Sequence, residues 1–200
     1  NYYYWPPVWL QNRPGFFTGS GLPMRFADTD GTLLDVYQAT TQMTDESGQT
    51  YPFTIDTLLD NALGPLGYYG AFVVNAHTDS TTSPVRDAVV ASALARGIPV
   101  ISAKQLLTWL DGRSGSTVSN LTGTPTSLSF TLSVAPGATG LALMLPIQPG
   151  QTVSTLTRNG SNAPYTVGTV KGVAYAFVPA SAGSYQVAFT TDTTPPTVSG

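Results

Sequence analysis

The spacing of the hydrophobic residues changes near residue 113 of this 200-residue chain. Before that position, the ranges 55–63, 84–96 and 103–112 place apolar side chains on one face of a helix. Beyond it, apolar residues alternate with Ser and Thr, as in the range 128–134, and this is the period of a half-buried strand. The chain is therefore predicted to contain an α/β segment followed by an all-β segment.

The charged residues follow the same division. Of the 11 acidic residues, all except Asp192 precede residue 113. The stretch 112–116 has the small, polar composition of a flexible connector, and we expect Gly112 to end the last helix. These features predict an α/β domain over residues 1–112, a β-sandwich domain over 113–192, and a linker over 193–200.

Short apolar runs flanked by Gly and Asp predict the strands of the first domain, which are expected at 22–27, 33–37, 69–76 and 98–101. Ser83 and Pro84 predict the start of the helix 84–96, and Ser102 with Gln105 forms a capping box for the last helix. Strands that alternate with helices imply a parallel sheet, either open or belonging to a barrel.

The composition limits which binding partners and which cellular compartment the chain is expected to have. Charged residues make up 10% of the chain, against roughly 25% in ordinary soluble domains. Cysteine is absent, and a net charge of -3 argues against nucleic acid or an anionic membrane as a partner. No apolar run approaches the roughly 18 residues that span a membrane. A weakly charged, hydroxyl-rich surface is typical of a secreted or cell-surface protein.

His77 is the first candidate for chemistry, because it follows a buried apolar strand and precedes Asp79 by two residues. Imidazole titrates near neutral pH and can act as a general acid or base when a carboxylate orients it. Strand ends of α/β folds are also where active groups gather. The alternative is that the side chain of His77 caps the turn that follows it.

Two further groups of residues are candidates. Asp28 and Asp30 place two carboxylates on a loop, where they could bind a divalent cation or act as acid and base, or simply stabilise an Asx turn. Tyr4, Trp5 and Trp9 form an aromatic cluster that could stack on sugar rings, or else lie buried against other parts of the protein.

The stretch from Tyr68 to Asp111 resembles the end of polysaccharide deacetylases, which are carbohydrate esterases with an incomplete (β/α) barrel. The strand Phe72-Val73-Val74-Asn75-Ala76-His77 matches the family strand that ends in a catalytic histidine, although the family usually has leucine where Asn75 stands. The helix that follows, the stretch 97–102 and the terminal helix match the next family elements. The resemblance implies a catalytic role for His77.

The family's metal site, with its Asp pair and His-x-x-x-His-like segment, has no counterpart in this chain, because His77 is its single histidine. No cofactor is expected in the chain itself, and a zinc ion is expected only in a complete domain. The resemblance therefore implies a further partner, the part of the same polypeptide N-terminal to Asn1. The chain is a hydrolase only if that part carries the metal motif.

The second domain resembles the immunoglobulin-like or fibronectin-like modules of secreted bacterial enzymes, and Asn159-Gly160 predicts a hairpin turn within it. The resulting hypothesis is a secreted carbohydrate-active protein. It would be a deacetylase-like or glycosidase-like hydrolase that acts on or recognises a surface glycan. Two alternatives remain open: a non-enzymatic extracellular structural or adhesion module, and a carbohydrate-binding module.

Overall fold

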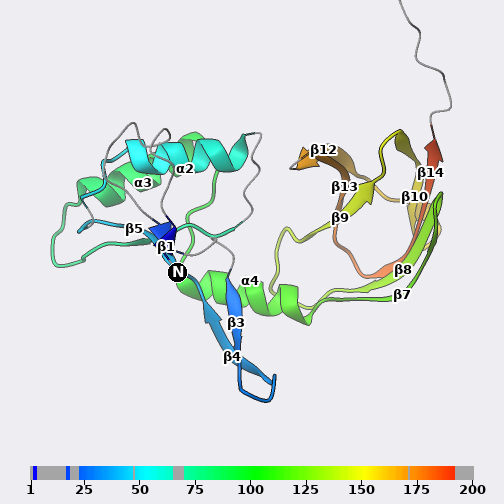
Figure 1. Cartoon of the computed structure of the whole chain (residues 1–200), viewed down its shortest axis with the longest axis horizontal. Coiled ribbons are helices and arrows are strands. Elements are labelled where there is room, and N and C mark those ends of the chain that lie inside the picture. Colours follow the sequence, from blue (N-terminus) through cyan, green and yellow to red (C-terminus); the bar gives the residue numbers. More distant parts are fainter. Residues whose placement is uncertain are drawn as a thin grey trace, which may run out of the picture. The chain divides into compact units, whose positions relative to one another are not determined.

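The computed structural model describes residues 2–3, 17–18, 23–46, 48–64, 70–170 and 172–191, and it combines helices with sheets, strands being the more frequent elements (Figure 1). The chain divides into two compact units, residues 1–101 and 102–200. Over the described ranges no barrel closes, and none of the helices is long and apolar enough to cross a membrane.

The first unit is built around a short parallel pair of strands, β5 (Thr41–Thr44) and β6 (Val73–Asn75). The predicted strand 69–76 is thus confirmed over residues 73–75 only, and Tyr69 lies outside the described residues. The helices α2 (Phe53–Leu63) and α3 (Pro84–Ala95) lie side by side (Figure 1). Their apolar faces and β5 share one core, formed by Met43, Ile55, Leu59, Val89 and Ala93.

The strands predicted at 22–27 and 33–37 form, but not as members of a parallel sheet. β3 (Met24–Ala27) and β4 (Leu33–Gln38) pair with each other in an antiparallel hairpin that extends away from α2 and α3 (Figure 1). The prediction of a parallel arrangement was wrong here, because the Asp28–Gly31 turn joins the strands directly and leaves no room for a crossover. A second antiparallel pair joins β1 (Tyr2–Tyr3) and β2 (Phe17–Thr18).

The strand predicted at 98–101 does not form. The Ser83 hydroxyl caps α3 as expected, and Gly97, with a φ of 67°, ends the helical segment. The N–H of Ile98 then donates to the carbonyl of Ala93, which closes the helix end. Because the N–H of Ile98 bonds the helix and Pro99 has no N–H, the first two residues of the segment have no donor for a strand ladder.

The capping box at Ser102 and Gln105 is confirmed, and it begins α4 (Ala103–Gly115). The helix continues through Gly112 instead of ending there, so the stretch 112–116 is not a connector. A Cβ atom on Gly112 would lie 2.4 Å from the backbone nitrogen of Ala138, which shows that this glycine permits close packing of the helix. The division between the compact units accordingly falls before α4, between Ile101 and Ser102.

The rest of the second unit consists of two antiparallel sheets, with strand orders β11-β10-β14-β8-β7 and β12-β13-β9. Their strands are β7 (Thr117–Thr124), β8 (Ser127–Ser133), β9 (Ala142–Ile147), β10 (Gln151–Arg158), β11 (Ser161–Asn162), β12 (Thr166–Val170), β13 (Val173–Pro179) and β14 (Gly183–Thr191). Residues that alternate along these strands face one shared core, as the period of two predicts.

The core of the second unit has contributions from both sheets. Phe130 of β8 stacks on Tyr185 of β14 with ring centroids 5.0 Å apart, and Val178 of β13 is also fully buried. Asn159 and Gly160 both have positive φ and join β10 to β11, which confirms the predicted hairpin turn.

Candidate functional site

Asp45 and His77 come together because they follow the two parallel strands of the first unit. Asp45 comes directly after β5 and His77 comes two residues after β6, with Thr44 and Asn75 in register. Parallel strands bring their carboxyl ends to the same edge of a sheet, and α/β folds place functional groups there. The backbone N–H of Asp45 also donates to the carbonyl of Asn75, at 3.3 Å, and this bond ties the two strand ends together.

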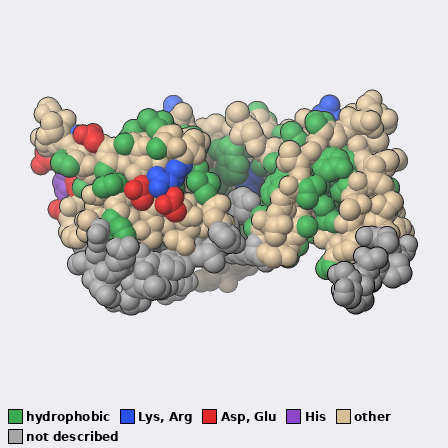
Figure 2. Space-filling model, turned by 90° about the horizontal axis from the view of Figure 1, so that it is seen from above, with side chains coloured by type: hydrophobic (Ala, Val, Ile, Leu, Met, Phe, Trp, Pro, Cys, Tyr) green, Lys and Arg blue, Asp and Glu red, His purple; other side chains and the backbone are tan. Residues whose placement is uncertain are grey.

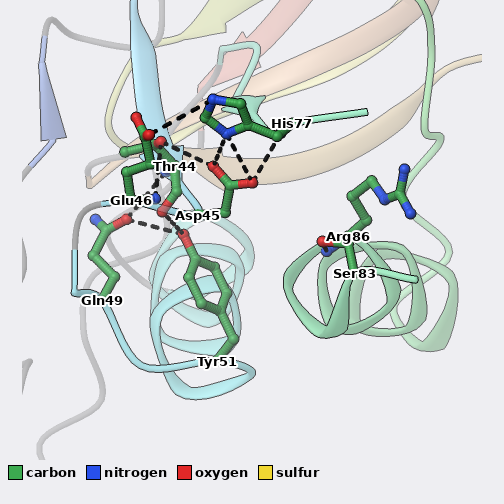
Figure 3. A network of polar contacts seen from close by, with 8 residues as sticks. All are labelled: Thr44, Asp45, Glu46, Gln49, Tyr51, His77, Ser83 and Arg86. Atoms are coloured by element: carbon green, nitrogen blue, oxygen red, sulfur yellow. Dashed lines mark hydrogen bonds and ion pairs between the residues drawn. The ribbon is translucent and has the colours of Figure 1, made fainter. Parts of the chain in front are cut away.

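The carboxylate of Asp45 contacts both the backbone N–H and the ring of His77 (Figure 3). The His77 N–H donates to Oδ2 of Asp45 at 2.8 Å, and ring atom Nδ1 lies 3.1 Å from Oδ1 and 3.3 Å from Oδ2. The backbone bond fixes where the histidine leaves its strand, and the ring contact favours a proton on Nδ1. The geometry therefore orients the imidazole and leaves Nε2 as its second, outward nitrogen.

Nε2 of His77 faces a second carboxylate, because Oε1 of Glu46 lies 3.6 Å from it (Figure 3). The side chain of His77 is 52% exposed and that of Glu46 71%, whereas Asp45 is only 19% exposed. In Figure 2 the single histidine is visible at the surface with acidic side chains beside it. Asp45 is thus the fixed member of the group, and Glu46 is a solvated neighbour that can leave Nε2 accessible.

The electrostatics of this group favour the charged pair. The hydrogen bond from the His77 ring to Asp45 raises the pKa of His77 above its usual value, with the negative charges of Glu46 and Asp45 adding to the effect. The backbone N–H of His77 in turn lowers the pKa of Asp45 below its usual value. Asp79, the orienting residue expected from the sequence, makes only the smallest of these contributions to the pKa of His77. These neighbours therefore shift the titration of the ring toward its charged form.

The other sequence candidates lie elsewhere. Asp28 and Asp30 occupy the tip of the β3–β4 hairpin, where their carboxylates accept hydrogen bonds from the backbone N–H groups of Thr29 and Thr32. Among the described residues, the side chains that contact the ring of His77 are those of Asp45 and Glu46, and not this pair. Tyr4, Trp5 and Trp9 lie outside the described residues.

Sequence reasoning missed Asp45 and Glu46 as candidates. The strand before them, Thr41-Gln42-Met43-Thr44, has one apolar residue, so it shows neither a hydrophobic run nor a clear alternation. Its buried positions are Gln42 and Met43, which are 2% and 1% exposed, and a buried glutamine is not a recognisable strand signal. The sequence signal that could have indicated this site was the pair Asp45-Glu46 itself, which lies in a turn shortly before Gly48.

The described residues offer no set of ligands for the zinc ion that the deacetylase resemblance implies. Within those ranges, no three side chains among His, Cys, Asp and Glu lie close enough together to hold a metal ion. One imidazole with an adjacent carboxylate does not make the three-ligand site that catalytic zinc requires. A histidine held against a carboxylate can transfer protons.

No protein-family model matches the sequence, and no curated protein matches it. Among solved structures, the chain is similar to a crystal structure of a bacterial fucosidase with an inhibitor, at 12% sequence identity and a TM-score of 0.26. The match covers 86% of this chain and 46% of the fucosidase chain, so this chain spans about half the length of its structural neighbour. A TM-score this low does not establish a shared fold.

Proposed function

We propose that the chain is part of a secreted carbohydrate-active hydrolase in which His77 transfers protons and Asp45 orients it. The observation that carries the proposal is the bonding of both the backbone N–H and Nδ1 of His77 to one carboxylate at the carboxyl edge of parallel strands. A histidine–carboxylate pair in such a position is the arrangement that general acid–base catalysis uses.

The raised pKa of His77 favours the role of general acid. A protonated imidazole held through Nδ1 can donate the proton on Nε2 to the oxygen or nitrogen that leaves when a glycan ester, amide or glycosidic bond breaks. Asp45 then stabilises the positive charge before the transfer and keeps the ring in place after it. Glu46 must turn away from Nε2 to admit the substrate, and its exposure makes this inexpensive.

The substrate class rests on the sequence. The resemblance to polysaccharide deacetylases and the weakly charged, hydroxyl-rich composition support an acetylated surface glycan, and a glycosidase-like reaction on the same polymer is the variant of this proposal. The deacetylase-like barrel, the zinc ion and the immunoglobulin-like or fibronectin-like character of the second unit belong to the same proposal. Asp28, Asp30 and Asp79 are retained as supporting residues, and Tyr4, Trp5 and Trp9 as sugar-stacking ones.

A second candidate function, glycan binding without chemistry, is favoured by a groove of about 490 Å³ along the five-stranded sheet. The strand register aligns Thr122, Ser129, Gln186 and Thr157 across four neighbouring strands. Charged residues are absent from the lining of this groove. A row of hydroxyl and amide groups without charge suits the hydrogen bonds of a neutral polysaccharide.

The test compares wild type with His77→Gln in the full-length protein, because glutamine keeps a polar group near Asp45 but cannot titrate. Acetate release and new reducing ends are measured on acetylated xylan and chitin oligosaccharides. We expect turnover to fall by about 10²- to 10⁴-fold, with Asp111→Asn as an exposed acidic control at wild-type turnover. Glycan binding that persists without any hydrolysis, and that is lost in Gln186→Ala, would favour the binding module instead.

A further inference from the structure

Gln49 lies four residues beyond Asp45 and turns its side chain back onto β5 (Figure 3). Its Oε1 accepts a hydrogen bond from the backbone N–H of Thr44 at 3.3 Å, and its Nε2 donates to the carbonyl of Gln42, also at 3.3 Å. The carboxamide therefore contacts the two peptide groups that flank Met43. One side chain thus bonds the strand in the way that the N–H and C=O of one residue on a neighbouring parallel strand do.

This contact lies on the edge of β5 that faces away from β6. Successive residues of a strand direct their N–H and C=O groups to opposite edges, and the N–H of Asp45 points to β6, where it donates to the carbonyl of Asn75. The N–H of Thr44 consequently points the other way, toward Gln49. The last residues of β5 are therefore held from both sides, by a strand on one edge and by a glutamine side chain on the other.

Tyr51 fixes Gln49 in this position. Its hydroxyl donates to Oε1 of Gln49 at 2.9 Å and lies 3.4 Å from the carbonyl of Thr44 (Figure 3). The ring of Tyr51 is half-buried and packs against the core shared by β5, α2 and α3. The turn that carries Asp45 and Glu46 is thereby connected to the rigid interior of the unit. Within the turn, the N–H of Glu46 donates to the hydroxyl of Thr44 at 3.3 Å.

We propose that Gln49 is a positioning residue for the His77–Asp45 pair, because its carboxamide and the Tyr51 hydroxyl hold the turn that presents the Asp45 carboxylate to His77. The inference deepens the proposed function and rests on it, since positioning has a catalytic purpose only if His77 transfers protons. Gln49 does not touch the imidazole, and its effect is transmitted through the backbone of Thr44 and Asp45.

A positioning role of Gln49 can be distinguished from a direct electrostatic effect on His77, because Gln49 carries no charge. The ionisable groups that act on His77 are Asp45 and Glu46 from the turn after β5, and Asp79 from its own loop. Gln49 and Tyr51 are uncharged at neutral pH, so replacing either leaves the net charge around His77 unchanged. A change in the titration of His77 then reports a displaced carboxylate, and not a lost charge.

The experiment is a ¹H NMR titration of the imidazole in the full chain, where His77 is the single histidine and its signals are unambiguous. Wild type should titrate above 6.5, the pKa of an unperturbed histidine, and Gln49→Ala should shift the midpoint down toward 6.5. Tyr51→Phe should cause a smaller shift in the same direction. Asn61→Ala is the matched control, because the side chain of Asn61 donates to the carbonyl of Thr57 within α2.

The outcomes separate the two proposals. A wild-type titration midpoint in both Gln49→Ala and Tyr51→Phe overturns the positioning role, even if His77 proves catalytic. A lowered midpoint together with hydrolysis that does not depend on His77 overturns the proposed function and leaves the structural coupling standing. If Gln49→Ala does not fold, Tyr51→Phe decides, since it removes a single hydroxyl. A variant that melts earlier but keeps the midpoint shows a purely structural glutamine.

Discussion

His77 and Asp45 are bonded twice, because Oδ2 of the carboxylate accepts the backbone N–H of His77 at 2.8 Å while Oδ1 lies 3.1 Å from the imidazole Nδ1. The first bond is present in every protonation state of the ring. The second strengthens when the ring is charged. The pair therefore combines a permanent structural link with a titratable one, and its contribution to stability depends on pH.

The stability of the first unit should be greatest between the two titrations of this pair. The folded-state pKa of His77 is raised, so its contribution is present below 6.5 and is lost as pH rises through the folded-state value. The pKa of Asp45 is lowered, so its contribution is present above 3.8 and is lost as pH falls through the folded-state value. Urea unfolding at a series of pH values should show this maximum.

Asp45→Asn should flatten the dependence of stability on pH on both sides of the maximum, because it removes the charge that each titration depends on. The difference in stability from wild type should be largest between the two pKa values, and it should be smaller above that of His77, where the uncharged ring no longer attracts the carboxylate of Asp45. Asp35→Asn on the exposed hairpin is the control. An Asp45→Asn profile parallel to wild type would show that the pair does not stabilise the fold.

Arg96 joins α2 to α3 and should not be replaceable by lysine without cost. Its Nε and Nη2 bond both carboxylate oxygens of Asp60 at 2.7 and 3.1 Å, and Nη1 reaches Asp56 at 2.8 Å. Lysine cannot form this fork, and we expect Arg96→Lys to lower the free energy of unfolding by about 1 kcal/mol, less at high salt. Arg86→Lys is the matched control, since Arg86 donates to backbone carbonyls of Ser80 and Thr81 at 3.4 and 3.3 Å. Equal losses in the two variants would contradict a special role for the fork.

Gly112 tests whether α4 belongs to the second unit. An added Cβ would lie 2.4 Å from the nitrogen of Ala138 and 2.6 Å from the carbonyl oxygen of Pro136, and neither backbone atom can rotate away. We expect Gly112→Ala to destabilise the second unit by about 1–3 kcal/mol, although alanine favours helices more than glycine does. Asp111→Ala, on the exposed face of α4, should change stability by less than about 0.5 kcal/mol. Calorimetry of both variants measures this. A neutral or stabilising Gly112→Ala would place the helix outside the packed unit.

Local sequence signals determined those elements whose cause is local. The Ser83 cap, the Ser102–Gln105 capping box and the Asn159-Gly160 turn depend on side chains bonding the backbone within a few residues, so their patterns can be recognised directly. The alternation of apolar residues beyond residue 113 likewise places the strands, because one face of each must be buried. His77 was found through its position after an apolar run.

Only the tertiary structure decided which other elements each local element pairs with or packs against. The apolar pattern of 22–37 fits a strand of any sheet, and only the short turn at Asp28–Gly31 made it a hairpin of its own. The sequence alone predicts that Gly112 ends a helix, whereas in the structure it lies within α4 and packs against Ala138. Asp45 lies 32 residues from His77 in the chain, and no local pattern connects them. Their contact exists because β5 and β6 pair in parallel, and strand register is set by long-range packing that the sequence does not display residue by residue.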